Sequence, residues 1–477
     1  MVLRKALMLL LAGLTAAVGP LLIGTCWSVS GASAATPHRH LVGARAQAAI
    51  SRRALAFVHG ANRGPSVGIT MPPVGLSIEY PVMAQDLGTG VCPPPALVAE
   101  LLQLGSPPLS LAGDSQDWTA PSGALSGAPS SWETATLYPL PAGFWSQLHC
   151  LLEAVGEPLT AGINAKTGQP SWAAQVVSGA QSAATKGLDF SLGNEPDLYN
   201  LPHLSALGKR LSTEDVAAVN RYLEVATYLQ QAIGSVPLLG PELAAAKHWQ
   251  RQLPRVIGQV HEGTVGVHMY PLSACTSPRA VTRRGLLSAR AADAPRDLAW
   301  VVADANAARV PAIISEANSA SCGGTAGVSD SPAAAVWAMR FVLTALKTGF
   351  REVRFHFSGG PYDPFIVRGE EVIARPLESA LLALNQWLPV GSSLRTVSGV
   401  RGLVTTGVSG ARGGPQVIFD NERTRAQSVV LRAAHQVVTE VLSAARAGLR
   451  TQALRPRHGR VKLSVAGNSV LAVLPQS

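Results

Sequence analysis

Two glutamates end apolar segments, at positions where a carboxylate can do chemistry. In "LDFSLGNEPDLYN" (188–200), apolar and polar residues alternate as in a β-strand, and Glu195 follows directly before Pro196. Proline cannot continue the hydrogen bonding of a central strand, so the strand must end there and leave the glutamate on its rim. Glu316 ends "PAIISE" (311–316) in the same way. Such a carboxylate either caps a helix or acts as a catalytic acid, and one stretch alone does not decide between these.

The segments around both glutamates repeat one pattern from residue 70 to 390. Short apolar strands alternate with amphipathic helices such as "SPAAAVWAMRFVLTALKTG", which predicts a parallel sheet. A helix follows each strand, which is the pattern of a (β/α)₈ barrel. We expect the strands over 74–80, 107–113, 159–164, 188–194, 236–240, 265–270, 311–316 and 352–357.

After residue 392 the pattern changes to short alternating runs such as "PQVIFDN" and "VKLSVAGNSVLAVLP". Turns rich in Gly, Asn and Arg separate these runs, which predicts an antiparallel β-sandwich. The predicted fold class is therefore α/β, a TIM barrel (71–391) with a C-terminal sandwich (392–477). The N-terminal segment (35–70) is an additional candidate strand of the sandwich.

Active sites of (β/α)₈ barrels lie at the C-terminal ends of the strands. The predicted strands deliver several polar side chains to that end, and the glutamates of strands four and seven face each other across it. The delivered residues are Glu79, Asp114, Asn194, Glu195, His268, Tyr270, Glu316 and His356.

Two facing carboxylates are what the hydrolysis of a glycosidic bond requires. One carboxyl group must be protonated to donate to the leaving oxygen, and the other must be ionised to attack the anomeric carbon. A separation of about 5–5.5 Å gives retention through a covalent intermediate, whereas a wider gap admits water and gives inversion. Asn194 could donate to a sugar hydroxyl, and a hydrogen bond from Tyr270 would keep the nucleophile ionised.

Several motifs carry a resemblance to known families. "GNEP" together with "SEANS" resembles the clan A retaining glycosidases. "EANSASCGG", "HMYPLSAC" and "GGPYDPF" resemble glycoside hydrolase family 79, the β-glucuronidase and heparanase-like family. The resemblance runs from about residue 74 to the C-terminus and includes a β-sandwich appended to the barrel. It implies Glu195 as general acid/base, Glu316 as nucleophile, Tyr270 as its orienting partner and Glu79 as a sugar-binding residue.

The same resemblance implies a site for the carboxylate of a uronic acid. Backbone N–H groups of Gly323 and Gly324 and the hydroxyl of Tyr362 would hold it. A pair of glycines suits this role, because their backbone can approach an anion closely. The sequence departs from the family after the second strand, where the family tends to have Gly-Gly followed by Asn or Thr and this chain has Ala112-Gly113-Asp114. The carboxylate of Asp114 can accept hydrogen bonds from sugar hydroxyls, but it adds negative charge to a site for an anion.

The N-terminus has the features of an export signal. "MVLRK" precedes an apolar run over 6–24, and "SGASAA" offers a cleavage site, so we expect a signal peptide over 1–34 and a secreted or cell-surface protein. An uncleaved membrane anchor is the alternative, because the apolar run is long. Cleavage would remove Cys26 and leave four cysteines.

An even number of cysteines in an exported protein suggests disulfides, and buried free thiols are the alternative. Cys275 and Cys322 follow neighbouring strands and could pair with each other. Cys92 and Cys150 would then form the second disulfide. No CxxC or HxxxH spacing indicates a metal site, and we expect no metal or other cofactor.

The composition narrows the possible partners. The 477-residue chain has 47% hydrophobic and 14% charged residues and a net charge of +10. Nucleic acid is the weakest candidate partner, since the arginines are scattered and the one dense group, "RPRHGR" (455–460), is interpreted as a solvated turn. Neither a dinucleotide-binding GxGxxG after a strand nor a P-loop is present.

Together these features predict an exported retaining exo-β-glucuronidase whose substrate is a glycan or glycoside with terminal β-linked glucuronic acid. An endo-acting, heparanase-like enzyme is the first alternative, and a clan A glycosidase for a neutral sugar is the second. A non-catalytic, anchored carbohydrate-binding protein is the alternative from another class. A membrane contact is expected only through the possible N-terminal anchor.

Overall fold

The computed structural model describes most of the chain beyond residue 65. The described residues are 66–121, 137–199, 211–397, 400, 402–410, 417–433 and 435–474. The expected signal peptide (1–34) and most of the expected N-terminal segment (35–70) lie outside these ranges. Within them, no helix combines the length and the apolar character that a membrane span needs.

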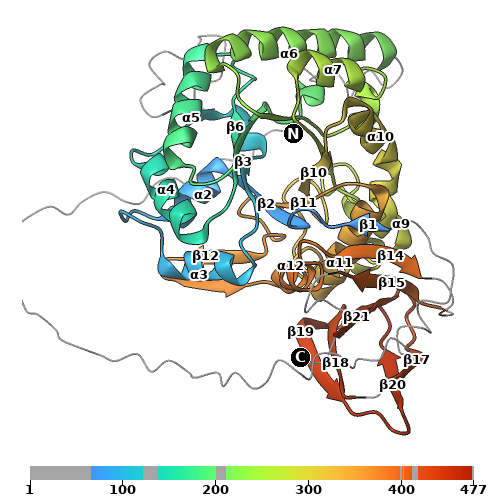
Figure 1. Ribbon diagram of the computed structural model, residues 1–477. Helices are drawn as coiled ribbons and strands as arrows, with labels where there is room; N and C mark the ends of the chain where they lie inside the picture. Colours follow the sequence, from blue (N-terminus) through green and yellow to red (C-terminus); the bar gives the residue numbers. More distant parts are fainter. Residues whose placement is uncertain are drawn as a thin grey trace, which may run out of the picture. The chain divides into compact units, whose positions relative to one another are not determined.

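Eight parallel strands form a closed barrel, which confirms the predicted (β/α)₈ fold (Figure 1). The order of the strands around the barrel is β10-β11-β2-β3-β6-β7-β8-β9. Most of their residues are buried on both faces, as expected where helices cover the outside of a parallel sheet. The strands are β2 (Val74–Glu79), β3 (Leu109–Ala112), β6 (Leu159–Ile163), β7 (Leu188–Leu192), β8 (Leu238–Leu243), β9 (Thr264–Met269), β10 (Ala312–Ala317) and β11 (Val353–Phe357).

The helices surround the barrel strands in Figure 1 and contribute their apolar faces to one large core. Several begin with proline in their first turn, where the missing N–H would have no intrahelical partner. The helices are α2 (Tyr80–Leu87), α3 (Pro95–Gln103), α4 (Phe144–Val155), α5 (Pro170–Ala183), α6 (Leu211–Ile233), α7 (Leu253–Val260), α8 (Arg283–Leu286), α9 (Ala289–Asp293), α10 (Ala299–Ala308), α11 (Pro332–Thr348) and α12 (Pro376–Trp387).

The C-terminal part is an antiparallel sheet domain, as predicted. A seven-stranded sheet has the order β1-β14-β15-β16-β21-β18-β19, and β17 pairs separately with β20. A second apolar cluster, which includes Phe419, Val429, Leu463 and Leu471, joins the two sheets as in a sandwich. The strands are β1 (Val67–Gly68), β14 (Ser393–Val397), β15 (Val404–Ser409), β16 (Val417–Asn421), β17 (Gln427–Arg432), β18 (Val437–Ser443), β19 (Arg446–Leu454), β20 (Arg460–Val465) and β21 (Ser469–Leu474).

Three features of the barrel half differ from the sequence prediction. The fifth strand, expected over 236–240, continues to Leu243, because a register shift against β9 accommodates Pro241 inside the strand. A β-hairpin, β12 (Phe365–Arg368) and β13 (Glu371–Ala374), is inserted between the eighth strand and α12. A further short pair, β4 (Thr119–Ala120) and β5 (Tyr138–Pro139), follows β3.

A buried ion pair joins the barrel half to the C-terminal sheet. Arg340 on α11 lies 2.8 Å from Asp420 on β16, and its guanidinium also donates to the backbone carbonyl of Asn421. Both charged side chains are nearly excluded from solvent. The ion pair and the hydrogen bond therefore attach α11 to β16 of the sheet domain.

Candidate active site

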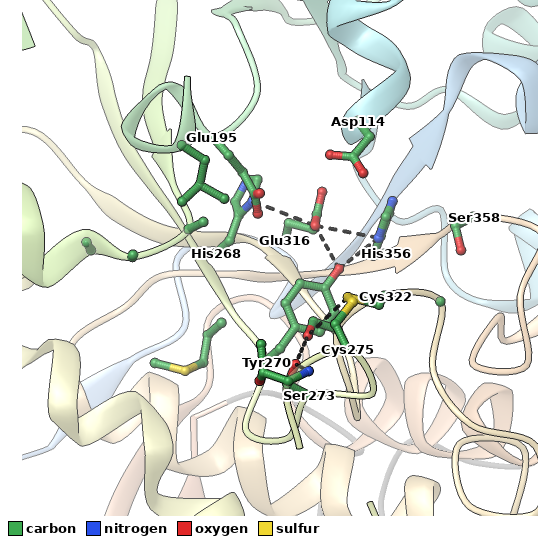
Figure 2. A pocket seen from close by; sticks show the side chains of 18 of the residues that line it. Asp114, Glu195, His268, Tyr270, Ser273, Cys275, Glu316, Cys322, His356 and Ser358 are labelled. Atoms are coloured by element: carbon green, nitrogen blue, oxygen red, sulfur yellow. Dashed lines mark hydrogen bonds and ion pairs between the residues drawn. A yellow bond between two sulfur atoms is a disulfide. The ribbon is translucent and has the colours of Figure 1, made fainter. Parts of the chain in front are cut away.

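A cavity of about 750 Å³ opens at the C-terminal ends of the barrel strands. Its lining includes both glutamates, and Figure 2 shows His268 and His356 flanking Glu316. The predicted residues that line this cavity are Glu79, Asp114, Glu195, Tyr270, Cys275, Glu316, Cys322, Gly323 and Tyr362. Asn194 and Gly324, also predicted to bind substrate, are not lining residues.

The loop after β7 holds Glu195 in a specific backbone conformation. Gly193 has a φ of +81°, and a Cβ at this glycine would lie 2.2 Å from the hydroxyl of Tyr199, so no larger residue fits. Glu195 itself is left-handed, with a φ of +51°, and its N–H donates to the backbone carbonyl of Glu242 (3.0 Å). The sequence Gly-Asn-Glu-Pro is therefore a turn that aims the glutamate into the cavity.

The polar neighbours in this motif secure the same loop. Asp197 accepts hydrogen bonds from the N–H groups of Ala244 and Ala245 at 3.1 and 2.7 Å, which ties the loop after β7 to the loop after β8. Asn194 is buried; its N–H donates to Asp117 (3.1 Å) and its amide donates to Asp114 (3.3 Å). Asn194 thus orients Asp114 from behind the cavity wall.

Glu316, one residue before the end of β10, has one hydrogen-bond donor and two histidine rings around its carboxyl group. The Tyr270 hydroxyl donates to Oε1 at 2.7 Å, and ring nitrogens of His356 and His268 lie 3.5 and 3.6 Å from the same oxygen. Burial raises the pKa of the Glu316 carboxyl, whereas the positive charges of His356 and His268 and the bond from Tyr270 oppose that rise. The other oxygen, Oε2, is buried and has no partner among the described residues.

The two glutamates lie close enough to act on one bond. A carboxylate oxygen of Glu195 and one of Glu316 are within 4.8 Å of each other, with a ring nitrogen of His268 equally near. This separation is short enough for direct attack by one carboxylate and leaves little room for a water molecule between them. The nearest oxygens of the pair are therefore close enough to lie on either side of one glycosidic bond.

The same three residues form a possible cation site by distance alone. His268 Nδ1, however, lies 3.0 Å from Glu195, which is hydrogen-bond distance. Burial favours the neutral ring, but the charge of Glu316 and the hydrogen bonds to Glu195 and Glu242 raise the pKa of His268 well above its usual range. His268 is therefore hydrogen-bonded on one side to Glu195 and on the other to Glu242.

Glu242 on β8 is a buried member of this cluster that sequence reasoning did not find. Its Oε2 lies 3.1 Å from Nε2 of His268 and also accepts the hydroxyl of Ser315. His268 therefore lies between the acid/base candidate Glu195 and a buried carboxylate. The sequence predicts a strand that ends at Gly240. Glu242, two residues later, is therefore not predicted to lie at the end of a barrel strand.

Glu79 and His356 form the opposite wall of the cavity. Glu79 accepts from His356 Nε2 (3.2 Å) and from the N–H groups of Asp114 (3.1 Å) and Ser115 (2.7 Å). Burial disfavours charge on Glu79, but the hydrogen bond and charge of His356 and the bonds of Ser115 outweigh it and lower its pKa. Burial by itself lowers the pKa of His356, yet Glu316 and Glu79 together raise it to about 9. This wall therefore holds an ionised carboxylate against an imidazolium.

Asp114 adds a second carboxyl group to this region. Burial, followed by the negative charges of Glu195 and Glu79, raises the pKa of Asp114. Its side chain is directed toward the cavity in Figure 2, where it is one of the labelled residues.

The predicted uronate-binding residues lie together at the end of the cavity nearest to His356. The Tyr362 hydroxyl is 3.0 Å from His356 Nδ1 and accepts from the hydroxyl of Ser358 at the same distance. Gly323 and Gly324 both have positive φ angles, +80° and +78°, and neither N–H donates to another described residue. Free backbone donors and a tyrosine hydroxyl are thus available close to one another.

Two disulfides are present, with the expected pairing. Cys275 and Cys322 join the loops after β9 and β10 with a Cα–Cα distance of 5.9 Å, and both line the cavity. Cys92 and Cys150 form the other disulfide, with a Cα–Cα distance of 5.5 Å. The first disulfide therefore constrains the wall that carries Tyr270 and Gly323.

The chain has the fold of the clan A (β/α)₈ glycoside hydrolases. It is similar over 87% of its length to a 4-O-α-L-rhamnosyl-β-D-glucuronidase from Fusarium oxysporum, at 17% identity and a TM-score of 0.65, with 99% of that chain covered. It is also similar to a GH51 arabinofuranosidase from Xanthomonas axonopodis pv. citri (12% identity, TM-score 0.61, 87% and 98% coverage). A GH30 endoxylanase from Clostridium papyrosolvens is similar at 12% identity and a TM-score of 0.52, with 87% and 99% coverage. No protein-family model matches the chain, and no curated protein is similar in sequence.

Proposed function

We propose that this protein is a retaining exo-β-glucuronidase that removes terminal β-linked glucuronic acid from glycans or glycosides. The observation that carries the proposal is the close pair of carboxylates, Glu195 and Glu316, whose oxygens lie within 4.8 Å at the mouth of a barrel of this fold. The fold of a β-glucuronidase, found at 17% identity, is consistent with the proposed sugar.

In the first step Glu316 attacks the anomeric carbon with its unpartnered oxygen, Oε2. Glu195, protonated, gives its proton to the glycosidic oxygen as the bond to the aglycone breaks, so the aglycone leaves as an alcohol. The hydrogen bond from Tyr270 holds Oε1 and directs Oε2 toward the substrate. The product of this step is a glycosyl ester on Glu316.

In the second step Glu195, now ionised, takes a proton from water that attacks the same carbon. The ester bond to Glu316 breaks, and glucuronate leaves with its original configuration after two inversions. His268 contacts Glu195 at 3.0 Å and Glu316 at 3.6 Å. Its positive charge therefore offsets the negative charge that moves between the two carboxylates during the cycle.

Specificity for glucuronate would come from the end of the cavity that holds Gly323 and Tyr362. The free backbone N–H groups of Gly323 and Gly324 and the Tyr362 hydroxyl would donate to the uronate carboxylate. His356, with a pKa raised to about 9, adds a positive charge beside Tyr362. Asp114 is the feature that favours the second candidate function, hydrolysis of a neutral β-glycoside.

Exo action is favoured by the charges around the cavity. Among the described residues that line it, Lys247 is the only lysine or arginine. An enzyme that held a long polyanion across this opening would need more cations along it. The protein would act outside the cytoplasm, since its N-terminal sequence has the features of an export signal and its two disulfides form in oxidising compartments.

A direct test compares hydrolysis of 4-nitrophenyl β-glucuronide and 4-nitrophenyl β-glucoside by the wild type, Glu316→Ala and Glu195→Ala. The proposal predicts turnover of the glucuronide that is lost in Glu316→Ala and severely slowed in Glu195→Ala. Azide attacks without a general base, so it should restore the rate of Glu195→Ala and give the β-glycosyl azide, whereas any azide product of Glu316→Ala should have the α configuration. Preference for the glucoside would contradict the uronate site, and an unchanged Glu316→Ala rate would contradict the mechanism.

A further inference from the structure

The positive charge of the chain is concentrated in its C-terminal domain. Residues 392–477 contain eleven arginines and one lysine against three acidic residues, which accounts for +9 of the total charge of +10. One of the three acids, Asp420, is buried against Arg340 and cannot balance the surface. The remainder of the chain is therefore close to neutral, although it is several times longer.

Backbone pairing brings five of these cations together on one surface. Arg432 on β17 stands directly opposite Arg460 on β20, and Arg457 exchanges backbone hydrogen bonds with Arg460 at 2.8 and 3.0 Å. Lys462 lies two residues beyond Arg460, on the same face of the strand. With Arg455 in the same turn, these exposed residues form what we call the basic face.

The cations of the basic face have no acidic partner in the part of the chain that the structure describes. None of its five side chains forms an ion pair with a described acidic residue. Like charges directly opposite each other in an antiparallel pair destabilise it, as at Arg432 and Arg460. An anionic partner from outside the protein would relieve this repulsion.

The composition of the domain restricts the kind of anion. Phe419 is the only aromatic residue in 392–477, and it is fully buried. Single-stranded nucleic acids and membrane surfaces are usually bound with the help of exposed aromatic or large apolar side chains. Val430, 51% exposed, is the only such apolar residue on these two strands. Recognition here must therefore depend on charge and on the planar hydrogen-bonding geometry of arginine.

We propose that the basic face binds an anionic polysaccharide through its carboxylate or sulfate groups. Arginine pairs with such groups in bidentate geometry, and anionic groups repeated along one polymer can engage several cations at once. The choice of a glycan rests on the proposed function, because a substrate glycan that contains glucuronic acid carries carboxylates of this kind. The domain would thus hold the enzyme on the material that it degrades.

The test measures binding of polygalacturonate by affinity electrophoresis in a Glu316→Gln background, so that turnover does not interfere. The variant Arg432→Gln/Arg460→Gln/Lys462→Gln removes three cations of the basic face. The control Arg251→Gln/Arg284→Gln/Arg290→Gln removes three exposed arginines of the barrel half that form no ion pairs. Binding of three other probes is measured in parallel. Dextran is a neutral glycan, and double-stranded DNA and phosphatidylglycerol vesicles are polyanions of other chemical classes.

We expect the basic-face variant to lose on the order of tenfold or more in affinity, whereas the control keeps its affinity. The slope of log K against log salt should fall by roughly one unit for each cation removed. An equal loss in the control, or no binding of polygalacturonate by the parent, would overturn the proposal. Tighter binding of DNA or vesicles than of polygalacturonate would overturn the glycan assignment.

The same variants with Glu316 restored separate this inference from the proposed function. Hydrolysis of 4-nitrophenyl β-glucuronide should be unchanged by the three basic-face substitutions, because none of these residues lines the cavity. Absence of hydrolysis in the parent would contradict the proposed activity while leaving the binding result intact. Loss of hydrolysis in the basic-face variant alone would contradict a surface that is separate from the site.

Discussion

The arrangement of single residues in the cavity explains how two carboxylates can take different roles. Glu316 is nearly buried and has a tyrosine hydroxyl and two histidines around it, while the Glu195 side chain is 21% exposed and contacts His268. Burial raises the pKa of the Glu316 carboxyl, while the two histidines and the hydrogen bond from Tyr270 favour the ionised form that a nucleophile needs. The more exposed carboxylate can exchange its proton with the leaving group and with water.

Glu242 should act as a positioning residue for Glu195 through His268. Glu242→Gln keeps a side chain that can accept from Nε2 but removes the charge that stabilises the His268 imidazolium. We expect kcat/KM to fall about tenfold to a hundredfold for an alkyl glucuronide and much less for 4-nitrophenyl glucuronide, because acid assistance matters most for poor leaving groups. Because Glu242 helps to raise the pKa of His268, the limb of the pH profile that depends on His268 should move to lower pH in Glu242→Gln.

Glu262→Gln is the matched control for Glu242→Gln. Glu262 is also buried, and burial followed by the charge of Glu242 raises its pKa to about 8, so it is mostly neutral at pH 7. It does not contact His268, and its replacement by glutamine should leave the rates and the pH profile nearly unchanged. Equal effects of the two substitutions, or equal losses on both leaving groups, would count against a role for Glu242.

The two glycines after Cys322 should respond differently to alanine. Both have positive φ angles, so each substitution should destabilise the protein by about 1–2 kcal/mol. A Cβ at Gly323 meets no atom within 4 Å, whereas one at Gly324 lies 2.8 Å from a ring carbon of Tyr362. Only Gly324→Ala should therefore also raise KM for the glucuronide, because its methyl group would displace Tyr362. Thermal unfolding and kinetics on both glycosides measure this, and equal KM values for the variants would contradict it.

At the scale of elements, the sequence predicted the barrel strands closely and their ends less well. Strands such as β9, expected over 265–270 and observed over 264–269, have uninterrupted apolar runs bounded by turn residues. β8 was predicted to end at Gly240, because local pattern does not reveal that a register shift can keep Pro241 within a strand. The hairpin β12–β13 was missed because it packs outside the barrel and leaves the alternating pattern intact.

The same distinction applies to the site. Placement of Glu195 and Glu316 on opposing rims follows from strand count alone, and both line the cavity. Whether a residue lines the cavity or supports it from behind depends on side-chain direction in three dimensions. Asn194, expected to contact sugar, instead donates to Asp114 from a buried position. The sequence signal for Glu242 is its position directly after Pro241, and it indicates a residue at the barrel rim only if the strand is known to continue through that proline.

The two disulfides should contribute differently to function. Each closes a long loop, with a sequence separation of 47 for Cys275 and Cys322 and of 58 for Cys92 and Cys150, so removing either pair by Cys→Ser should cost about 2–4 kcal/mol. Only Cys275 and Cys322 line the cavity. Their double variant should therefore raise KM for the glucuronide, while the Cys92→Ser/Cys150→Ser variant keeps the wild-type KM. Similar KM values for both variants would contradict this assignment.

At the scale of the whole molecule, the barrel half and the sheet domain share a polar anchor in Arg340 and Asp420. Arg340 also donates to the backbone carbonyls of Leu287 and Asn421, so its charge and its donors are satisfied within the protein. Burial raises the pKa of Asp420 to about 6 even with Arg340 beside it. The unpaired carboxylate would therefore be costly to keep ionised in this environment.

Arg340→Met should lower the free energy of unfolding by about 3–5 kcal/mol at pH 8, because Asp420 is left buried and unpaired. The folded-state pKa of Asp420 lies above its ordinary value, so protonation stabilises the folded form as pH falls through about 6. The loss should therefore be smaller at pH 5 than at pH 8. Arg340→Met/Asp420→Leu should recover most of the stability, and denaturant unfolding at both pH values measures this. A larger loss at pH 5 would contradict the argument.

The central claim is that Glu316 forms a covalent bond to the sugar, and trapping this bond tests it most directly. The protein is incubated with 2-deoxy-2-fluoro-β-glucuronosyl fluoride, and its proteolytic peptides are analysed by mass spectrometry. We predict one fluoroglucuronosyl adduct, on the peptide that contains Glu316, and no adduct in Glu316→Gln. Turnover of glucuronide without any adduct, or an adduct on Glu195, would contradict the account.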